Sequence, residues 1–354
     1  MKPAVRSRRR FGDTKLLLLG DDAVRHARFG ELAERLDPGD LVVVNRSGTL
    51  PSSFRGHVEK SREEIEIRLA AFQGPHPGDL TEWLAVSFGA GDWRRRTEDR
   101  GPPPRLEVGE VLHFAGGLSA RILGVQDERL LRVRFEASGK PEASSGVAAP
   151  GVGALYRAGR PIQYSYLEEE IAVWDQQTLF SGAPISVEAP SAGFAFDWEL
   201  WRRLRARGVN FATVLHGAGL SSTGSAALDR RLPLAEWSEV PDVTIQAIEA
   251  ARRAGRRVVA LGTTVLRALE SAWVPGEGLR PRAGLTTLRI SPAHTIRSVT
   301  HLVTGMHDLG ESHRDIVHAI VSPELAAAAD AQAEARGYFS HEYGDLALVG
   351  PVKG

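Results

Sequence analysis

Short glycine-containing turns that follow β-rich segments are the features of this sequence best suited to bind a ligand. Gly262-Thr263-Thr264 follows an apolar segment and precedes a segment in which apolar residues recur at helical spacing. Backbone N–H groups at a helix start favour negative charge, so this turn and its two hydroxyls could hold an anionic group. The alternative is that Thr263 or Thr264 only caps the helix. A second turn, His216-Gly217-Ala218-Gly219, follows the β-rich segment 209–215.

Histidines near the ends of predicted strands are candidates for proton transfer, and there are four of them: His216, His301, His307 and His313. Histidine is the usual general acid or base near neutral pH. Because their spacing is irregular and the chain contains no cysteine, the sequence predicts no metal site. His307 is the first candidate for a base because Asp308 follows it and Thr304-Gly305 precedes it. A structural role is the alternative for each of the four.

The stretch 183–223 positions two candidate loops and predicts strand, turn, helix, strand and turn in succession. Ile185 and Val187 belong to the first apolar segment, which Ala189-Pro190-Ser191-Ala192-Gly193 interrupts. Asp197 is a suitable cap for the helix that follows. Ligands of open α/β sheets bind outside the carboxyl ends of the strands. Both turns are therefore candidate binding loops, although ordinary turns are the alternative.

Strands and helices alternate at both ends of the chain, which is typical of the α/β class. By contrast, short β-rich segments without helices follow one another between residues 52 and 135, which predicts a small antiparallel β-barrel. We expect residues 1–51 and 154–354 to form an α/β domain with a mixed or parallel sheet and flanking helices. The barrel domain 52–135 is inserted into it, and the segment 136–153, rich in Gly, Ser, Ala and Pro, is a flexible linker.

The composition favours a soluble cytoplasmic protein. The 354 residues carry 44 basic and 44 acidic side chains, so any polyanion would have to bind a local patch such as Arg94-Arg95-Arg96. The absence of cysteine excludes disulfides and thiolate chemistry. No apolar run reaches the roughly 18 residues of a membrane helix, so we expect no membrane partner. The basic N-terminus lacks the apolar segment of a secretory signal.

An ordered series of segments resembles the S-adenosylmethionine:tRNA ribosyltransferase-isomerase family of queuosine biosynthesis, and it extends over nearly the whole chain. The similar segments are Pro38-Gly39-Asp40-Leu41-Val42-Val43-Val44-Asn45, Leu106-Glu107-Val108-Gly109-Glu110-Val111-Leu112, Ala189-Pro190-Ser191-Ala192-Gly193-Phe194-Ala195-Phe196, Leu215-His216-Gly217-Ala218-Gly219-Leu220-Ser221-Ser222-Thr223, Gly262-Thr263-Thr264-Val265-Leu266-Arg267-Ala268-Leu269-Glu270-Ser271, Leu302-Val303-Thr304-Gly305-Met306-His307 and Tyr343-Gly344-Asp345-Leu346-Ala347-Leu348.

The resemblance implies an enzyme that moves the ribosyl unit of S-adenosylmethionine onto 7-aminomethyl-7-deazaguanine at the wobble position of tRNA and forms epoxyqueuosine. S-adenosylmethionine is then a co-substrate, and a tRNA with a queuosine-type anticodon is the partner. We expect a monomer without a metal. The alternatives are a divergent enzyme of the same fold that uses another acceptor, and a noncatalytic protein that binds nucleosides or RNA.

The candidate site residues follow from the strand ends and from the segments that match the family. His307 and His216 are candidate bases, since a sulfonium acidifies the neighbouring carbon. The methionine carboxylate suits Arg267 or the turn at residues 262–264. The residues expected to bind S-adenosylmethionine are Pro190, Ser191, Ala192, Gly193, Phe194, Gly217, Gly219, Gly262, Thr263, Thr264 and Arg267.

The chain also departs from the family pattern, mostly in segments expected to face the substrate. Ala195 stands where the family has histidine, and Gly305 stands where it has asparagine. Asp308-Leu309-Gly310-Glu311-Ser312 replaces a segment that contains proline and lysine. The loss of lysine and the gain of two acids disfavour a phosphate. We therefore expect these changes to alter the part of the site that binds the acceptor. The turn at residues 262–264 should still bind the donor, S-adenosylmethionine.

Overall fold

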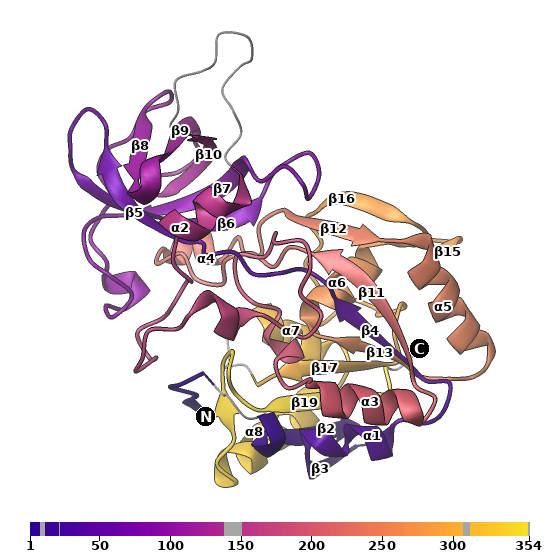
Figure 1. Cartoon of the computed structure of the whole chain (residues 1–354). Coiled ribbons are helices and arrows are strands. Elements are labelled where there is room, and N and C mark those ends of the chain that lie inside the picture. Colours follow the sequence, from indigo (N-terminus) through magenta and orange to yellow (C-terminus); the bar gives the residue numbers. More distant parts are fainter. Residues whose placement is uncertain (8–10, 21, 138–150, 307–311, 353–354) are drawn as a thin grey trace.

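The protein consists of a large mixed β-sheet flanked by helices and a closed antiparallel barrel at one end (Figure 1). The computed structural model describes residues 1–7, 11–20, 22–137, 151–306 and 312–352. The predicted fold class, a mixed α/β sheet with an added small barrel, is confirmed.

The large sheet has nine strands in the order β16-β12-β11-β4-β13-β17-β19-β2-β3. Their bounds are β2 (Lys15–Gly20), β3 (Ala23–Arg28), β4 (Leu41–Asn45), β11 (Asn210–His216), β12 (Glu236–Val240), β13 (Val258–Leu261), β16 (Arg282–Thr286), β17 (His301–Gly305) and β19 (Leu346–Val349). The four central strands, β11, β4, β13 and β17, are mutually parallel. Their carboxyl ends therefore meet at one edge of the sheet.

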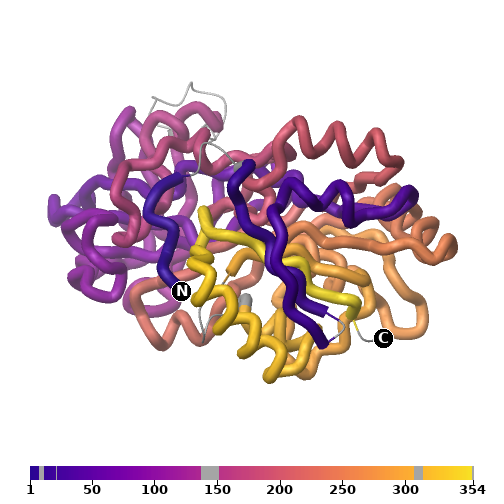
Figure 2. The backbone as a smooth tube through the Cα atoms, turned by 90° about the horizontal axis from the view of Figure 1, so that it is seen from below, coloured from indigo at the N-terminus to yellow at the C-terminus, as the bar shows by residue number. Residues whose placement is uncertain are grey.

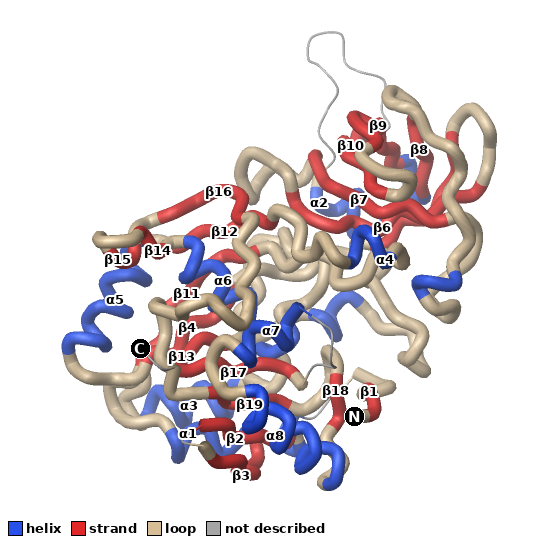
Figure 3. Tube along the Cα trace, turned by 180° about the vertical axis from the view of Figure 1, so that it is seen from behind, coloured by secondary structure: helices blue, strands red, loops and turns tan. Residues whose placement is uncertain are grey.

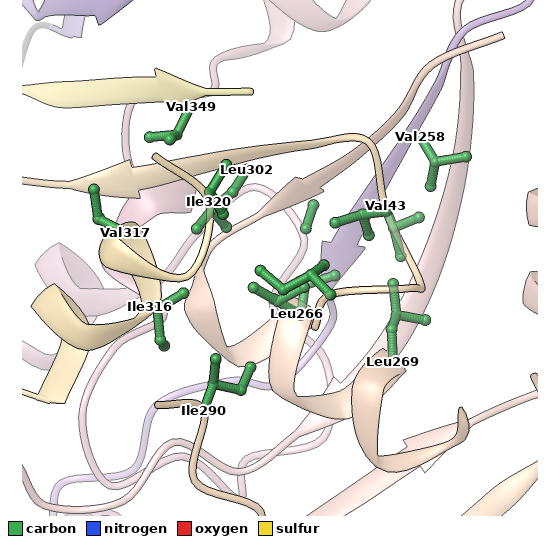
Figure 4. Close-up of a cluster of buried hydrophobic side chains, with 14 of the residues drawn as sticks. Val43, Val258, Leu266, Leu269, Ile290, Leu302, Ile316, Val317, Ile320 and Val349 are labelled. Carbon is green, nitrogen blue, oxygen red and sulfur yellow. The ribbon is translucent and has the colours of Figure 1, made fainter. Parts of the chain in front are cut away.

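Alternating side chains of the central strands pack on two layers of helices. On one face lie α1 (Leu32–Arg35) and α3 (Trp198–Ala206), seen in front of the sheet in Figure 1. The opposite face, seen in Figure 3, carries α5 (Asp242–Arg253), α6 (Thr263–Ser271), α7 (Ser312–His318) and α8 (Pro323–Ala335). In Figure 4, Leu266 and Leu269 of α6 lie beside Val43 of β4 and Val258 of β13. This packing fixes the start of α6 at the edge where the parallel strands end.

The barrel closes in the order β10-β7-β6-β5-β8-β9 through antiparallel pairs. Its strands are β5 (Ser53–Val58), β6 (Glu64–Phe72), β7 (Glu82–Phe88), β8 (Val111–Phe114), β9 (Leu118–Val125) and β10 (Leu130–Ala137). Phe54, Phe114 and Phe135 fill part of its interior, with ring centroids 5.0–6.2 Å apart. The short helices α2 (Val152–Ala158) and α4 (Ala226–Asp229) lie beside the barrel (Figure 1).

The barrel also supports the loop that follows β11. The backbone N–H of Leu220 donates to the carbonyl of Ala70 on β6 at 2.9 Å. The side-chain amide of Gln73 donates to the carbonyl of Ala235, just before β12, at 3.2 Å. Leu215 and Trp237 belong to the same hydrophobic cluster as the barrel interior. The loop between β11 and β12 is thus held between the barrel and the sheet.

Two short two-stranded sheets complete the fold. The short strand β1 (Lys2–Pro3) pairs in parallel with β18 (Phe339–Ser340), so the N-terminal segment runs beside the C-terminal part of the chain (Figure 2). A second small pair joins β14 (Trp273–Val274) to β15 (Gly278–Leu279).

Some local predictions were wrong. Residues 183–187 form no strand and contact Thr49 through a single bridge at Ser186, because Ile185 and Val187 pack into the barrel cluster instead. The flexible linker expected at 136–153 stays a prediction, because residues 138–150 lie outside the described residues; its first residues belong to β10 and its last lie at the start of α2.

Candidate active site

The site lies at the switch point of the sheet, where the strand order changes from one side of β4 to the other. From β4 the chain adds β11 on one side and β13, then β17, on the other. Loops at such a switch point diverge and leave a crevice outside the carboxyl ends of the strands. Here β4 ends at Asn45, β11 at His216, β17 at Gly305, and Gly262 directly follows β13. Four strand ends therefore meet at this edge, and the loops after β11, β13 and β17 border the crevice.

A cavity of about 680 Å³ occupies this crevice, a size typical of small-molecule sites. Its wall is formed by the loops after β11, β13 and β17, by residues 188–192, and by residues 341–342 before β19. Eight residues predicted to bind S-adenosylmethionine line this cavity: Pro190, Ser191, Ala192, Gly219, Gly262, Thr263, Thr264 and Arg267.

The other predicted residues that the structure describes do not line this cavity. Gly193 and Phe194 lie in a short helical turn, where Phe194 stacks on Tyr343 with ring centroids 5.2 Å apart. Gly217 is covered by the carbonyl of Ile185, which an added Cβ would approach to 2.8 Å. His216 is fully buried behind the cavity wall. His307 lies outside the described residues.

A buried ionic group forms the wall between β11, β12 and α6. The carboxylate of Glu236 accepts from Arg267 Nη1, from His216 Nε2 at 2.8 Å and from the backbone N–H of Gly219 at 2.7 Å. Although burial alone would raise its pKa, these three partners, chiefly the charge of Arg267, lower the pKa of Glu236 to about 2. Burial lowers the pKa of His216 despite the contact with Glu236. At neutral pH the group is therefore a Glu236–Arg267 ion pair beside a neutral imidazole.

Arg267 keeps one guanidinium nitrogen without a partner among the described residues. Its Nε donates to the carbonyl of Leu288 at 3.0 Å, and its Nη1 contacts Glu236. Its Nη2 is buried and has no partner in the part of the chain that the structure describes. Buried polar atoms are nearly always paired, so an unpaired guanidinium nitrogen on a cavity wall indicates a place for a ligand acceptor. Arg230 and Arg289 add two more cations to the same wall.

The start of α6 offers a second set of hydrogen-bond donors to an anion in the cavity. Gly262 precedes the helix with φ 100° and ψ 153°, a backbone conformation that is essentially restricted to glycine. This geometry turns the chain sharply from β13 into α6, and among the described residues no side chain caps the helix start. The first N–H groups of α6 remain available beside Thr263 and Thr264 on the cavity wall. This end of the cavity thus suits a carboxylate or phosphate.

Replacing Gly262 with alanine should lower the free energy of unfolding by about 2 kcal/mol, because alanine is strained in this conformation. The added Cβ has room, with Ala192 at 3.5 Å, so the effect comes from the backbone. Urea unfolding measures it, with Gly101→Ala as the control because Gly101 has open space and no positive φ. Equal unfolding midpoints for the two variants would show that the Gly262 backbone is not strained by a side chain.

A second wall of the cavity is acidic and aromatic. Tyr164 donates to Glu188 and Tyr166 donates to Glu342, and the two tyrosine rings stack with centroids 6.1 Å apart. The ring of His341 stacks on Tyr166 at 4.8 Å. All five side chains belong to residues that line the cavity. The cavity is therefore polar at both walls, with cations on one and carboxylates on the other.

The comparisons with known proteins assign the chain to a family. A family model described as a queuosine biosynthesis protein matches residues 3–349. The chain belongs to this queuosine biosynthesis family. The S-adenosylmethionine:tRNA ribosyltransferase-isomerase of Gloeobacter violaceus is 32% identical over 96% of this chain and 90% of its own length. The protein of the same name from Anaeromyxobacter dehalogenans is 35% identical over 95% of this chain and 92% of its own.

The fold is also that of a solved structure. The crystal structure of an S-adenosylmethionine tRNA ribosyltransferase from Thermotoga maritima is similar with a TM-score of 0.51 and 23% identity. The alignment covers 98% of this chain and 95% of that one. The resemblance to the queuosine biosynthesis family that the ordered segments predicted is confirmed.

Several residues of the segments that resemble the queuosine biosynthesis family support the fold. Asp40 accepts from the backbone N–H groups of Asp37 and Arg257 at 2.9 Å each. Asp345 accepts from those of Lys15 at 2.8 Å and Phe339 at 2.9 Å. These buried carboxylates join segments that are distant in sequence.

The two single-residue departures from the pattern of the queuosine biosynthesis family lie in different surroundings. Gly305 lines the large cavity. Ala195 is buried in the hydrophobic cluster beneath α3, does not line the large cavity and lines a separate one of about 10 Å³. The segment 308–312 lies outside the described residues except for the backbone of Ser312.

Sequence reasoning missed the acidic residues of the site. Glu188 precedes the predicted turn at residues 189–193, and Glu236 begins a strand that was not predicted. Tyr164 and Tyr166 lie in a polar, aromatic segment without a recognisable period. The two tyrosines are two residues apart, and in an extended chain this spacing places both rings on the same side. That spacing was the only signal for them in the local sequence.

In the described ranges, no group of three or more His, Cys, Asp or Glu side chains is arranged to hold a metal ion. The same ranges contain no helix of sufficient length and apolar character to cross a membrane.

Proposed function

We propose that this protein is an S-adenosylmethionine:tRNA ribosyltransferase-isomerase. It transfers the ribosyl unit to 7-aminomethyl-7-deazaguanine at the wobble position of a queuosine-type tRNA and forms epoxyqueuosine, as a cytoplasmic monomer without a metal. The observation that carries this proposal is the cavity at the switch point, which is lined by residues of several segments that resemble the family and has a cationic and an acidic wall. The names of relatives that match over nearly the whole chain support it.

In this proposal the cationic wall holds the methionine carboxylate of the donor. Arg267 Nη2 and the first N–H groups of α6 supply hydrogen-bond donors that suit a carboxylate. Thr263 and Thr264 supply hydroxyls beside them. Residues 190–192 and Gly219 contribute the small, side-chain-poor parts of the wall against which a nucleoside can lie.

The reaction also requires removal of a proton next to the sulfonium. We propose His307 for this step because it follows the strand end at Gly305 in sequence. His216 then acts as a positioning residue, since its Nε2 contacts Glu236 and its ring does not line the cavity. By orienting Glu236, His216 keeps Arg267 directed at the donor.

Incubation with S-adenosylmethionine labelled in the ribose, with and without tRNA that carries the deazaguanine precursor, tests this function. We expect release of adenine only with precursor tRNA and labelled epoxyqueuosine in the digested product. The matched control is Arg202→Ala, which removes an exposed side chain of α3 and should keep full activity.

Other outcomes contradict the proposal in distinguishable ways. Adenine release without epoxyqueuosine would indicate a different acceptor, in line with Gly305 on the cavity wall. Absence of S-adenosylmethionine binding by folded protein in calorimetry would favour a noncatalytic nucleoside- or RNA-binding protein.

A further inference from the structure

The acidic wall is built from two similar tyrosine–glutamate pairs. Tyr164 and Tyr166 are two residues apart and stack with an interplanar angle of 16°. Each hydroxyl donates to one carboxylate, Tyr164 to Glu188 and Tyr166 to Glu342. The two glutamates come from segments far apart in the sequence, yet both line the same cavity. The parallel rings therefore fix two carboxylates beside each other.

Each carboxylate keeps one oxygen that no described residue contacts by a hydrogen bond. Glu188 Oε1 accepts from the hydroxyl of Tyr164 and from the backbone N–H and hydroxyl of Ser221, both at 3.1 Å. For Glu188 Oε2, no hydrogen-bond partner exists among the described residues, and the same is true of Glu342 Oε1. Two carboxylate oxygens on a cavity wall are thus left to accept hydrogen bonds from a ligand.

An unpaired hydroxyl in the same cavity indicates a ligand independently of the carboxylates. Thr304 is 1% exposed, lines the cavity, and its Oγ1 has no partner within the described ranges. The backbone N–H of His341 donates to the carbonyl of Met306 at 3.1 Å, which brings the end of β17 beside the segment that bears Glu342. Buried hydroxyls rarely remain unpaired, so a bound polar group is expected here, and a hydroxyl can accept a hydrogen bond from it.

We propose that Glu188 and Glu342 together bind a protonated primary amine of a substrate, and that Tyr164 and Tyr166 hold the two carboxylates in position for it. An ammonium group carries three donors and no acceptor, which matches two free carboxylate oxygens and a hydroxyl. The identity of the amine rests on the proposed function. It is either the aminomethyl group of the deazaguanine acceptor or the methionine ammonium of the donor.

The surroundings of Glu188 make amine binding depend on pH. Burial and the nearby charge of Glu342 raise the pKa of Glu188 to about 7. Burial also raises the pKa of both tyrosines, so they remain protonated donors at neutral pH. The titratable or charged groups near Glu188 include Tyr164 and Tyr166, Glu342 with His341 before β19, and Arg68 on β6; Asp229, Arg230, Glu236, Arg267 and Arg289 line the same cavity.

The sign of the pH effect follows from the charges. An ammonium binds the ionised form of Glu188 and opposes its protonation, so amine affinity should rise as the pH increases through about 7. A bound cation also offsets the repulsion between the two glutamates, which lowers the pKa of Glu188 and releases a proton on binding.

Three matched ligand pairs test the proposal by calorimetry or ligand-observed NMR, without turnover. They are 7-aminomethyl- against 7-methyl-7-deazaguanine, S-adenosylmethionine against its analogue without the amino group, and benzylamine against benzyl alcohol. In at least one pair the amine should bind about tenfold more tightly at pH 8, the effect of one charged hydrogen bond. The first two pairs distinguish acceptor from donor, and the third does not depend on the proposed function.

Variants connect the preference to the two glutamates. Glu188→Gln and Glu342→Gln should each abolish the preference for the amine, and Glu188→Gln should also abolish its change between pH 6 and pH 8. Tyr164→Phe should weaken the preference without removing the carboxylate, while Arg202→Ala should retain it. Thermal unfolding verifies that each variant is folded.

Equal binding of amine and non-amine in all three pairs by the unmodified, folded protein would overturn the proposal. An unchanged preference in both folded glutamine variants would also overturn it. If benzylamine alone shows the preference and no adenine is released in the transferase assay, the amine site stands and the proposed function fails.

Discussion

Replacing Arg267 with methionine is expected to lower the free energy of unfolding by about 3–5 kcal/mol, the cost of leaving a buried charge unpaired. Glu236 is 4% exposed and Arg267 is 7% exposed, so solvent cannot replace the lost partner. The remaining side-chain partner, His216, has a lowered pKa and is neutral at pH 7. Urea unfolding at pH 7 measures the loss through the shift of the midpoint.

The double variant Glu236→Gln with Arg267→Met separates the buried charge from lost packing. Because a neutral amide replaces the orphaned carboxylate, the double variant should recover much of the stability lost by Arg267→Met. Strict additivity of the two single effects would contradict this account, since residues in one ion pair must show coupling. The affinity for S-adenosylmethionine should remain low in the double variant, because Arg267 Nη2 is absent from it as well as from Arg267→Met.

The pattern of side chains was sufficient to predict the elements that fill the interior. The segment 41–44 is apolar throughout and lies in β4, which is buried at every position. The barrel segments alternate or are bounded by turn residues, so each predicted strand was found between Ser53 and Ala137. Here burial and local periodicity agree, and no long-range information is needed. The division into an α/β domain and an inserted barrel domain at residues 51–52 and 153–154 stays a prediction.

Elements fixed by distant partners could not be predicted in the same way. The strand β12 has only five residues, and its first residue, Glu236, is charged. Its register comes from β11 on one side and β16 on the other. Ile185 and Val187 have the composition of a strand but pack into the barrel interior instead. In each case tertiary contacts decide a conformation that the local sequence leaves open.

The binding loops of the site could be predicted from the sequence, but its glutamates could not. Gly219, Gly262 and their neighbours lie in turns that follow strands, and the carboxyl ends of parallel strands meet at one edge of the sheet. Glu188 and Glu342 meet only after the chain has folded, and nothing in their local sequence distinguishes them from exposed glutamates. The ordered family segments identified the fold for a related reason, since residues such as Asp40 connect distant elements through buried hydrogen bonds.

Replacing Asn45 with alanine is expected to cost about 3 kcal/mol of stability, because two buried N–H groups lose their acceptor. Asn45 ends β4, and its Oδ1 accepts from the N–H groups of His216 at 3.0 Å and Ser47 at 3.1 Å. Its Nδ2 donates to the carbonyl of His216 at 2.8 Å and to Thr264 Oγ1 at 3.2 Å. One side chain thus joins the ends of β4 and β11 to the start of α6.

The consequence for the site should be visible as well as the loss of stability. Without Asn45 the hydroxyl of Thr264 is released and the end of β11 is no longer held against α6, so S-adenosylmethionine should bind more weakly in calorimetry. The matched control is Asn210→Ala at the opposite end of β11, where the side chain is exposed and the effect should stay within about 0.5 kcal/mol. If Asn45→Ala and Asn210→Ala unfold at the same urea concentration, the buried hydrogen bonds of Asn45 do not hold the strand ends together. If Asn45→Ala is destabilised but keeps full donor affinity, the start of α6 is positioned by the packing of Leu266 and Leu269 alone.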